Sequence, residues 1–206
     1  MVYLHEPSIL ILDKLSDNAL MISVRDGGLE RLGLLFERYK RPLYGFFYGM
    51  TGDQELSDDL VQNTFYRVMK YRHLFRVRPP EAGSDGQGDG EFKAWLFHIA
   101  RNVRHDHFRK DKIKGKDPVE NWEHKLGHSE HKSEEMQHDE EHMMLNLAMD
   151  RLSPEKREVL LLSKYQEKKY KEIGQILGCT EGAVKVKVFR ALQELKGVYE
   201  KLEKQM

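Results

Sequence analysis

Apolar residues recur every three or four positions along most of this chain, and this spacing limits its possible folds more than any other feature. Such a period matches one face of an α-helix, whereas a half-buried strand alternates apolar and polar residues. Runs with this spacing begin at Leu29, Leu60, Phe92 and Val159. Because no segment shows convincing alternation, the sequence predicts an all-α protein.

Local signals predict where the first helices begin and end. Pro42 is expected to kink or break a helix that starts near Leu29, and a second helix then continues to a turn at Gly52 and Asp53. Ser57 is expected to cap the next helix. The predicted buried stripe of that helix consists of Leu60, Val61, Thr64, Phe65, Val68 and Met69.

Two polar surfaces follow from the same spacing. Opposite the buried stripe lies a polar face, which fits either ordinary solvated surface or a docking site: Asp59, Gln62, Asn63, Tyr66 and Lys70. A fourth helix begins near Phe92, and its C-terminal half gathers four cations: Arg101, Arg104, Arg109 and Lys110. Trp95 falls in the inward stripe of this helix, which favours a place in the core.

Two stretches lack the helical pattern and divide the chain. Residues 76–91 contain Pro79-Pro80 and several glycines, which predict a loop. From Ile113 to about His142 acids and histidines accumulate while hydrophobic residues become sparse, so we expect a flexible, acidic, His-rich linker. The predicted organisation is a 1–16 extension, a 17–112 domain, a 113–144 linker and a 145–206 domain.

The second domain contains two periodic segments separated by a tight turn. A helix opens at Ser153-Pro154-Glu155, and a later one runs over Tyr170–Leu177. Gly178 can adopt the left-handed conformation that ends this helix, and Thr180 can cap another running from about Glu181 to Leu195. A helix, a three-residue turn and a second helix together predict a helix-turn-helix.

The two sides of this last helix differ in chemistry. Advancing about 100° per residue, one side is expected to enter the core: Val184, Val188, Ala191, Leu192 and Leu195. The other side holds Gly182, Val186, Phe189, Arg190 and Gln193, flanked by Lys185 and Lys187. In a DNA groove cations contact phosphates or guanine edges and apolar groups meet thymine methyls. A purely structural helix pair with a charged outer side is the alternative.

Charge and cysteine content narrow the class of protein. The formal net charge is zero, but residues 113–150 carry −6 and residues 151–206 carry +5, so the second domain is suited to phosphates. The single cysteine, Cys179, excludes an internal disulfide and suits the cytoplasm. The apolar run Ile9–Leu12 is too short to span a membrane or form a signal peptide.

Two pairs of segments resemble one protein family. In the first domain these are Asp59-Leu60-Val61-Gln62-Asn63-Thr64-Phe65 and residues 92–103, FKAWLFHIARNV. In the second they are residues 152–159, LSPEKREV, and the stretch from Tyr170 to Ala191. They resemble, in the expected order, the two conserved domains of bacterial RNA polymerase sigma factors of the extracytoplasmic-function (ECF) type. The resemblance covers roughly residues 17–112 and 145–200.

The resemblance implies a function. Such a protein directs core RNA polymerase to promoters, recognises their upstream (−35) and downstream (−10) elements and opens the DNA, without catalysis or a cofactor. It implies that Asp59, Gln62, Asn63 and Tyr66 dock on a coiled coil of the polymerase β′ subunit. The β flap and an anti-sigma factor are further expected partners, and the chain is expected to be cytoplasmic with no membrane insertion.

The resemblance also assigns the DNA contacts. On the single non-template strand, Asn102 would contact a flipped-out base while Arg101, Arg104, Arg109 and Lys110 follow the phosphates. The loop at 76–91 occupies the place of the family's base-capturing loop. Contacts with the duplex upstream element would fall on Lys185, Val186, Lys187, Phe189 and Arg190.

The sequence departs from the family at several of these positions. Lys187 and Val186 stand where arginine and serine are frequent, and Asn63 stands where many members have glutamate. Lysine lacks arginine's bidentate fork and valine cannot donate a hydrogen bond, so an unfamiliar promoter preference is expected.

Two other functions remain open from the residues alone. A ligand-responsive helix-turn-helix regulator would bind duplex DNA without polymerase. The His124/His128 and His138/His142 pairs have a spacing that can hold zinc on a helix. Because no third ligand is evident, no metal site is predicted.

Overall fold

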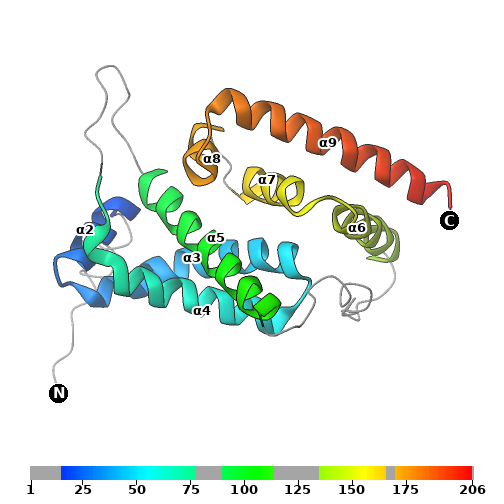
Figure 1. Ribbon diagram of the computed structural model, residues 1–206. Coiled ribbons are helices and arrows are strands. Elements are labelled where there is room, and N and C mark those ends of the chain that lie inside the picture. The colour runs from blue at the N-terminus through cyan, green and yellow to red at the C-terminus, as the bar shows by residue number, and fades with distance from the viewer. Residues whose placement is uncertain (1–14, 78–89, 114–134, 166–169, 206) are drawn as a thin grey trace. The chain divides into compact units, whose positions relative to one another are not determined.

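The computed structural model describes residues 15–77, 90–113, 135–165 and 170–205 (Figure 1). Across these ranges the chain forms α-helices and short 3-10 segments with no strand, so the all-α prediction is confirmed. The fold divides into two compact units, one of residues 1–47 and 54–116 and one of residues 48–53 and 117–206.

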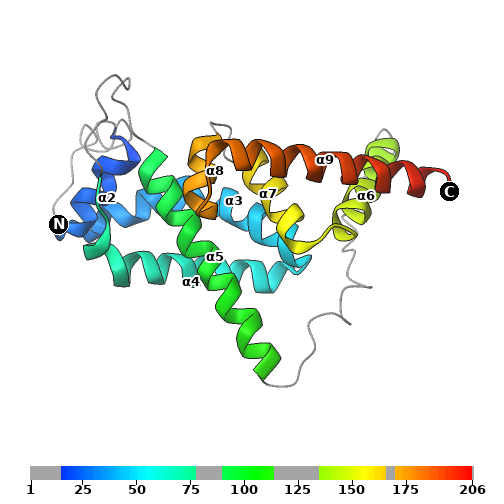
Figure 2. The ribbon, with the colours of Figure 1, turned by 45° about the horizontal axis from the view of Figure 1, so that its top comes forward.

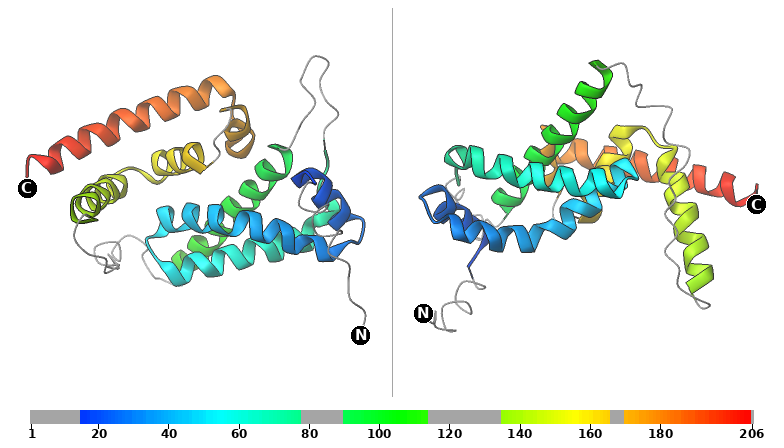
Figure 3. Two further views of the ribbon diagram at one scale, coloured as in Figure 1. Left: turned by 180° about the vertical axis from the view of Figure 1, so that it is seen from behind. Right: turned by 90° about the horizontal axis from the view of Figure 1, so that it is seen from below.

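The described residues of the first unit form α-helices and short 3-10 segments, and the last turn of α3 falls in the second unit. In chain order these are α2 Asp17–Arg25, η1 Leu29–Arg31, α3 Leu32–Thr51, α4 Gln54–Tyr71, η2 Arg72–Leu74 and α5 Gly90–Ile113. Helices α3 and α4 lie side by side, and α5 packs across α4 (Figure 3). Aromatic side chains join the helices: Phe36 of α3 meets Phe65 of α4 at 5.0 Å between ring centroids, and Phe46 meets Phe97 of α5 at 5.6 Å.

Polar contacts fix α2 against α3 and α5. The carboxylate of Asp17 accepts hydrogen bonds from Arg38, at 2.7 Å, and from the Tyr39 hydroxyl. Asn18 is 8% exposed, and its Oδ1 accepts a hydrogen bond from the backbone N–H of Phe92 at 2.9 Å. Because Phe92 lies in the first turn of α5, Asn18 satisfies a donor that has no partner within its own helix.

A break at Pro42, one of the two outcomes expected there, does not occur, and the cap expected at Ser57 is wrong. Pro42 does not break α3, which runs through it from Leu32 to Thr51. The residues around the proline, Tyr39, Leu43 and Phe46, are buried, and this packing offsets the lost backbone hydrogen bond. Ser57 does not cap α4 either: it lies one turn inside a helix that begins at Gln54, with its side chain buried.

The helices described in the second unit are α6 Glu135–Asp150, α7 Pro154–Tyr165, α8 Tyr170–Leu177 and α9 Glu181–Glu203. Helix α9 packs against α6, α7 and α8 (Figures 1 and 2). It extends two turns beyond the predicted end at Leu195. Helix α6 begins within the segment expected to be a flexible linker, where methionine, glutamate and glutamine have high helix propensity.

A buried arginine joins α6 to α7. Arg157 is 6% exposed, its Nε donates to the Met149 carbonyl at 2.9 Å, and its Nη1 lies 3.1 Å from an Asp150 carboxylate oxygen. Burial lowers the pKa of Arg157, against the opposing effect of Asp150. The arginine therefore closes the corner between the two helices at the cost of desolvating its charge.

Candidate nucleic-acid interface

The turn between α8 and α9 sets the direction of the last helix. Gly178 has φ +68°, the left-handed conformation expected for it, and the Thr180 hydroxyl accepts from Ala183 N–H at 3.2 Å as an N-cap. Gly174 of α8 packs against this turn, and its carbonyl accepts from Cys179 N–H at 2.9 Å. Local chemistry thus fixes where α9 begins, and α8 has the predicted bounds.

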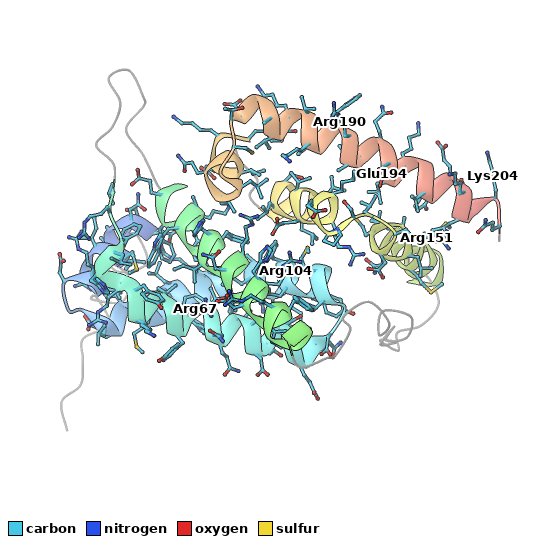
Figure 4. The ribbon with its side chains drawn as sticks, viewed as in Figure 1. Arg67, Arg104, Arg151, Arg190, Glu194 and Lys204 are labelled. Atoms are coloured by element: carbon cyan, nitrogen blue, oxygen red, sulfur yellow. The ribbon has the colours of Figure 1, made fainter. Side chains whose placement is uncertain are left out.

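The outer face of α9 has the composition predicted for it. Exposed side chains on this face are Lys185, Val186, Lys187, Phe189 and Arg190. Val186 is 48% and Phe189 62% exposed, whereas Val184, Val188 and Ala191 on the opposite side are buried. Lys185 pairs with Glu181 one turn earlier at 2.9 Å. Large apolar groups therefore stand in solvent among three cations, one of which, Arg190, is labelled in Figure 4.

Two residues expected in the core of this helix are not buried: Leu195 is half-buried, and Leu192 is exposed. Leu192 is 51% exposed. It lies about 100° around the helix from Ala191, beyond the strip that α7 and α8 cover. On the other edge of the packed side, about 160° around the helix from Leu192, Glu194 forms an ion pair with Lys156 of α7 (Figure 4).

The predicted strand-binding residues of α5 differ in accessibility. Asn102 and Arg109 are exposed, whereas Arg101 and Arg104 are half-buried. Arg109 Nη2 lies 3.3 Å from Oδ1 of Asp106. The other carboxylate oxygen of Asp106 accepts a hydrogen bond from Arg67 of α4 at 2.8 Å. Figure 4 labels Arg67 and Arg104. The side chain of Lys110 lies outside the described residues. Asn102 and Arg109 are therefore the accessible members of the predicted set.

Sequence reasoning missed two histidines on the same helix. His98 and His105 are exposed and share a face with Asn102 and Arg109, at spacings of four, three and four residues. Asn102 Nδ2 lies 3.4 Å from His98 Nδ1. Their spacing along a helix face is a signal that the sequence itself contains. Imidazole rings can stack on bases in single strands.

Trp95 lies within an aromatic cluster. Its ring centroid is 5.3 Å from that of Phe75 and 6.4 Å from that of Phe92, both of which are fully buried. The indole itself is half-buried. This position agrees with the interpretation of Trp95 as a core residue.

The polar face of α4 is accessible along its length. Asp59, Gln62, Asn63 and Tyr66 are all exposed, and Tyr66 is 58% exposed. Of the stripe expected to be buried on the opposite side, Met69 is 38% exposed, although the adjacent Val68 is fully buried. The described residues thus present a polar α4 surface with one large aromatic ring.

Several sequence predictions fall outside the described residues. These are the loop residues 78–89, the linker residues 114–134, and the side chains of His138 and His142. Among the residues that are described, no group of three His, Cys, Asp or Glu side chains is placed to hold a metal ion. No described helix is both long and apolar enough to cross a membrane.

Comparison with protein families gives two matches, one in each half of the chain. The family model described as "Sigma-70 region 2" matches residues 35–84, and the one described as "Sigma-70, region 4" matches residues 142–195. The second match includes α7, α8 and the first four turns of α9. The first match covers α4 and ends before α5.

Curated relatives match across most of the chain. The ECF RNA polymerase sigma factor SigM of Bacillus subtilis (strain 168) is 29% identical over 169 residues, which are 80% of this chain and 93% of SigM. The RNA polymerase sigma factor CarQ of Myxococcus xanthus is 26% identical over 181 residues, 87% of this chain and 95% of CarQ.

Solved structures share the fold. CnrH, solved with the cytosolic domain of CnrY, aligns with a TM-score of 0.64 at 20% identity, covering 90% of this chain and 97% of CnrH. The sigma factor RpoE, solved with the anti-sigma factor NepR from Bartonella quintana, aligns with a TM-score of 0.59 at 24% identity, covering 84% and 97%.

Proposed function

The chain belongs to the sigma-70 family and to its ECF group of RNA polymerase sigma factors, and from this premise we propose which of its surfaces bind the promoter and the polymerase. As a sigma factor it directs core RNA polymerase to promoters. The proposed role requires binding only, with no chemical step by the protein and no cofactor. It places the protein in the cytoplasm, with the chromosome.

The upstream promoter element is bound by the outer face of α9. Lys185, Lys187 and Arg190 contact phosphates or base edges, and Val186 and Phe189 face the floor of the major groove. The observation that supports this assignment is the exposure of Val186 and Phe189 among cations, on a helix that begins directly after a helix-turn-helix turn. An apolar pair so exposed gains from burial in a groove.

The downstream element is held as a single strand by the exposed stripe of α5. Asn102 hydrogen-bonds a flipped-out base, His98 and His105 stack or bond beside it, and Arg109 lies along the phosphates. Arg101 and Arg104 support this track from half-buried positions. Stacking is worth roughly 1–3 kcal/mol per base. It offsets part of the cost of unstacking a few base pairs, and the contacts with the upstream element and the polymerase supply the rest.

The polymerase is bound by the polar face of α4. Asp59, Gln62 and Asn63 meet the β′ coiled coil, and Tyr66 supplies the large buried contact that such interfaces favour. The second unit contacts the β flap. An anti-sigma factor is a further proposed partner, because the structural neighbour RpoE was solved with one.

In-vitro transcription with core polymerase and promoters from the source genome tests the assignment. Arg190→Ala should reduce initiation strongly, whereas Lys201→Ala, which removes an exposed cation farther along α9, should not. Asn102→Ala should also reduce initiation, and a template already opened around the start site should rescue it. The opened template should not rescue Arg190→Ala.

A ligand-responsive regulator would give a different pattern. Such a protein binds its duplex site tightly without polymerase, and its effect on transcription requires a factor already bound to the core enzyme. If the purified protein and core polymerase initiate from no genomic promoter, the assignment fails.

A further inference from the structure

We propose that Val186 reads the 5-methyl group of a thymine in the upstream promoter element, and that it makes this promoter preference depend on thymine at one position. The proposal rests on the proposed function, because it takes the outer face of α9 to lie in a major groove. It adds a specificity-determining residue and the chemical group that this residue recognises.

The position of Val186 on α9 favours a base rather than a phosphate. It lies opposite the buried residues Val184, Val188 and Ala191, with its side chain 48% exposed. Lys185 and Lys187 are each about 100° away on either side, and Arg190 about 40° away on the next turn. Because long cations flank it on both sides, the short side chain at the centre faces the groove floor.

The chemistry of valine selects one base. In the major groove, guanine, adenine and cytosine present donors and acceptors, whereas thymine adds a methyl group that gains from apolar contact. Valine has no polar atom, so an amino or carbonyl edge packed against it would lose water without gaining a partner. Opposite thymine, in contrast, three methyl groups exclude water together.

Phe189 strengthens this selection without replacing it. It lies about 60° from Val186 around the helix, one turn further along, and is 62% exposed. Its ring can form one wall of the pocket that receives the methyl group. The two side chains together form an apolar surface that is bordered by cations, which matches a base edge bordered by phosphates.

Deoxyuridine substitution provides a direct test, because uracil differs from thymine only by that methyl group. The assay uses holoenzyme assembled from the full chain and core polymerase, on a promoter selected from a library with a randomised upstream element. Each thymine of that element, on either strand, is replaced in turn by deoxyuridine. At one position we expect promoter affinity to fall about fourfold, the value of one buried methyl group.

Two serine variants link the effect to the residue. Val186→Ser should lose most of the discrimination between thymine and uracil at that position. Leu192→Ser is the matched control: Leu192 is 51% exposed on the same helix but lies about 120° around it from Val186. It should retain the full discrimination. Because both residues are exposed, neither variant should unfold the domain.

The outcomes separate this inference from the proposed function. If wild-type holoenzyme initiates normally and no deoxyuridine changes its affinity by more than about 1.5-fold, the methyl contact does not exist, while the sigma function stands. The assignment to Val186 is overturned if Val186→Ser keeps the discrimination, or if only Phe189→Ser removes it. Absence of initiation from every library member would instead defeat the proposed function.

Discussion

Gly174 allows α8 to lie against the turn that begins α9, and its replacement by alanine gives a sensitive test of this packing. A Cβ atom at Gly174 would lie 2.6 Å from the carbonyl oxygen of Cys179 and 3.6 Å from the nitrogen of Glu181. Both are backbone atoms. The turn is also held by the Cys179 N–H to Gly174 carbonyl bond and by the Thr180 cap, so it cannot move away freely.

The expected change in stability is the difference between two effects. Alanine is a better helix former than glycine by about 1 kcal/mol. Forcing an added methyl group into a packed contact costs typically 1–3 kcal/mol, and weakening the Cys179 N–H bond costs about 1 kcal/mol more. We therefore expect Gly174→Ala to lower the free energy of unfolding by about 1–3 kcal/mol.

Gly197→Ala provides the matched control. Gly197 is also a helical glycine, in α9, but a Cβ atom there meets nothing within 4 Å. The Gly197→Ala substitution should therefore raise the free energy of unfolding by up to about 1 kcal/mol. Urea unfolding of the full chain followed by circular dichroism measures both changes, and hydrogen exchange of α8 and α9 locates them. If Gly174→Ala proves as stable as the wild type or more so, the close approach does not control this turn.

Three further predictions concern contacts elsewhere. Asn18→Ala should destabilise the first unit by about 1–3 kcal/mol, because it leaves the buried N–H of Phe92 without its acceptor. Hydrogen exchange at the start of α5 should then increase, and unchanged exchange there would contradict the role given to Asn18. Tyr66→Ala should weaken binding to core polymerase by about 1–4 kcal/mol in a fluorescence titration, without changing the unfolding midpoint. Burial raises the pKa of Asp150 despite the opposing effect of Arg157. The protonated carboxyl group of Asp150 therefore stabilises the fold at pH values below its pKa in the unfolded chain, and this stabilisation is lost as pH rises through its pKa in the folded protein. Over that pH range the free energy of unfolding of the wild type, measured relative to Asp150→Asn, should fall, and a rise would contradict the inferred sign.

The helix-turn-helix could be predicted closely because neighbouring residues determine it. Gly178 provides the left-handed turn and Thr180 provides the cap, so the bounds of α8 and the start of α9 follow from local chemistry. The exposed face of α9 follows from the same start by rotation. These features need no knowledge of distant contacts.

Errors occurred where tertiary packing opposed a local preference. Pro42 interrupts a backbone hydrogen bond, yet α3 continues because buried side chains on both sides of it hold the helix together. Leu192 is apolar and follows a buried residue, but it remains 51% exposed among the described residues. The sequence analysis assigned no role to Arg157, and its buried contacts with Met149 and Asp150 appear only in the structure. In each case the neighbouring side chains decide whether a residue is buried, and the spacing of residues along the chain does not reveal which neighbours those are.

The hydrogen bond from Phe92 to Asn18 has a consequence for the order of folding. The proposed strand-binding helix starts with a donor whose acceptor lies 74 residues earlier in the chain. The first turn of α5 therefore cannot complete its hydrogen bonding until a long loop has closed, however favourable its own sequence is. Newly synthesised α5 should remain frayed at its N-terminus until α2 docks, so assembly of the first unit becomes a precondition for an intact −10 surface.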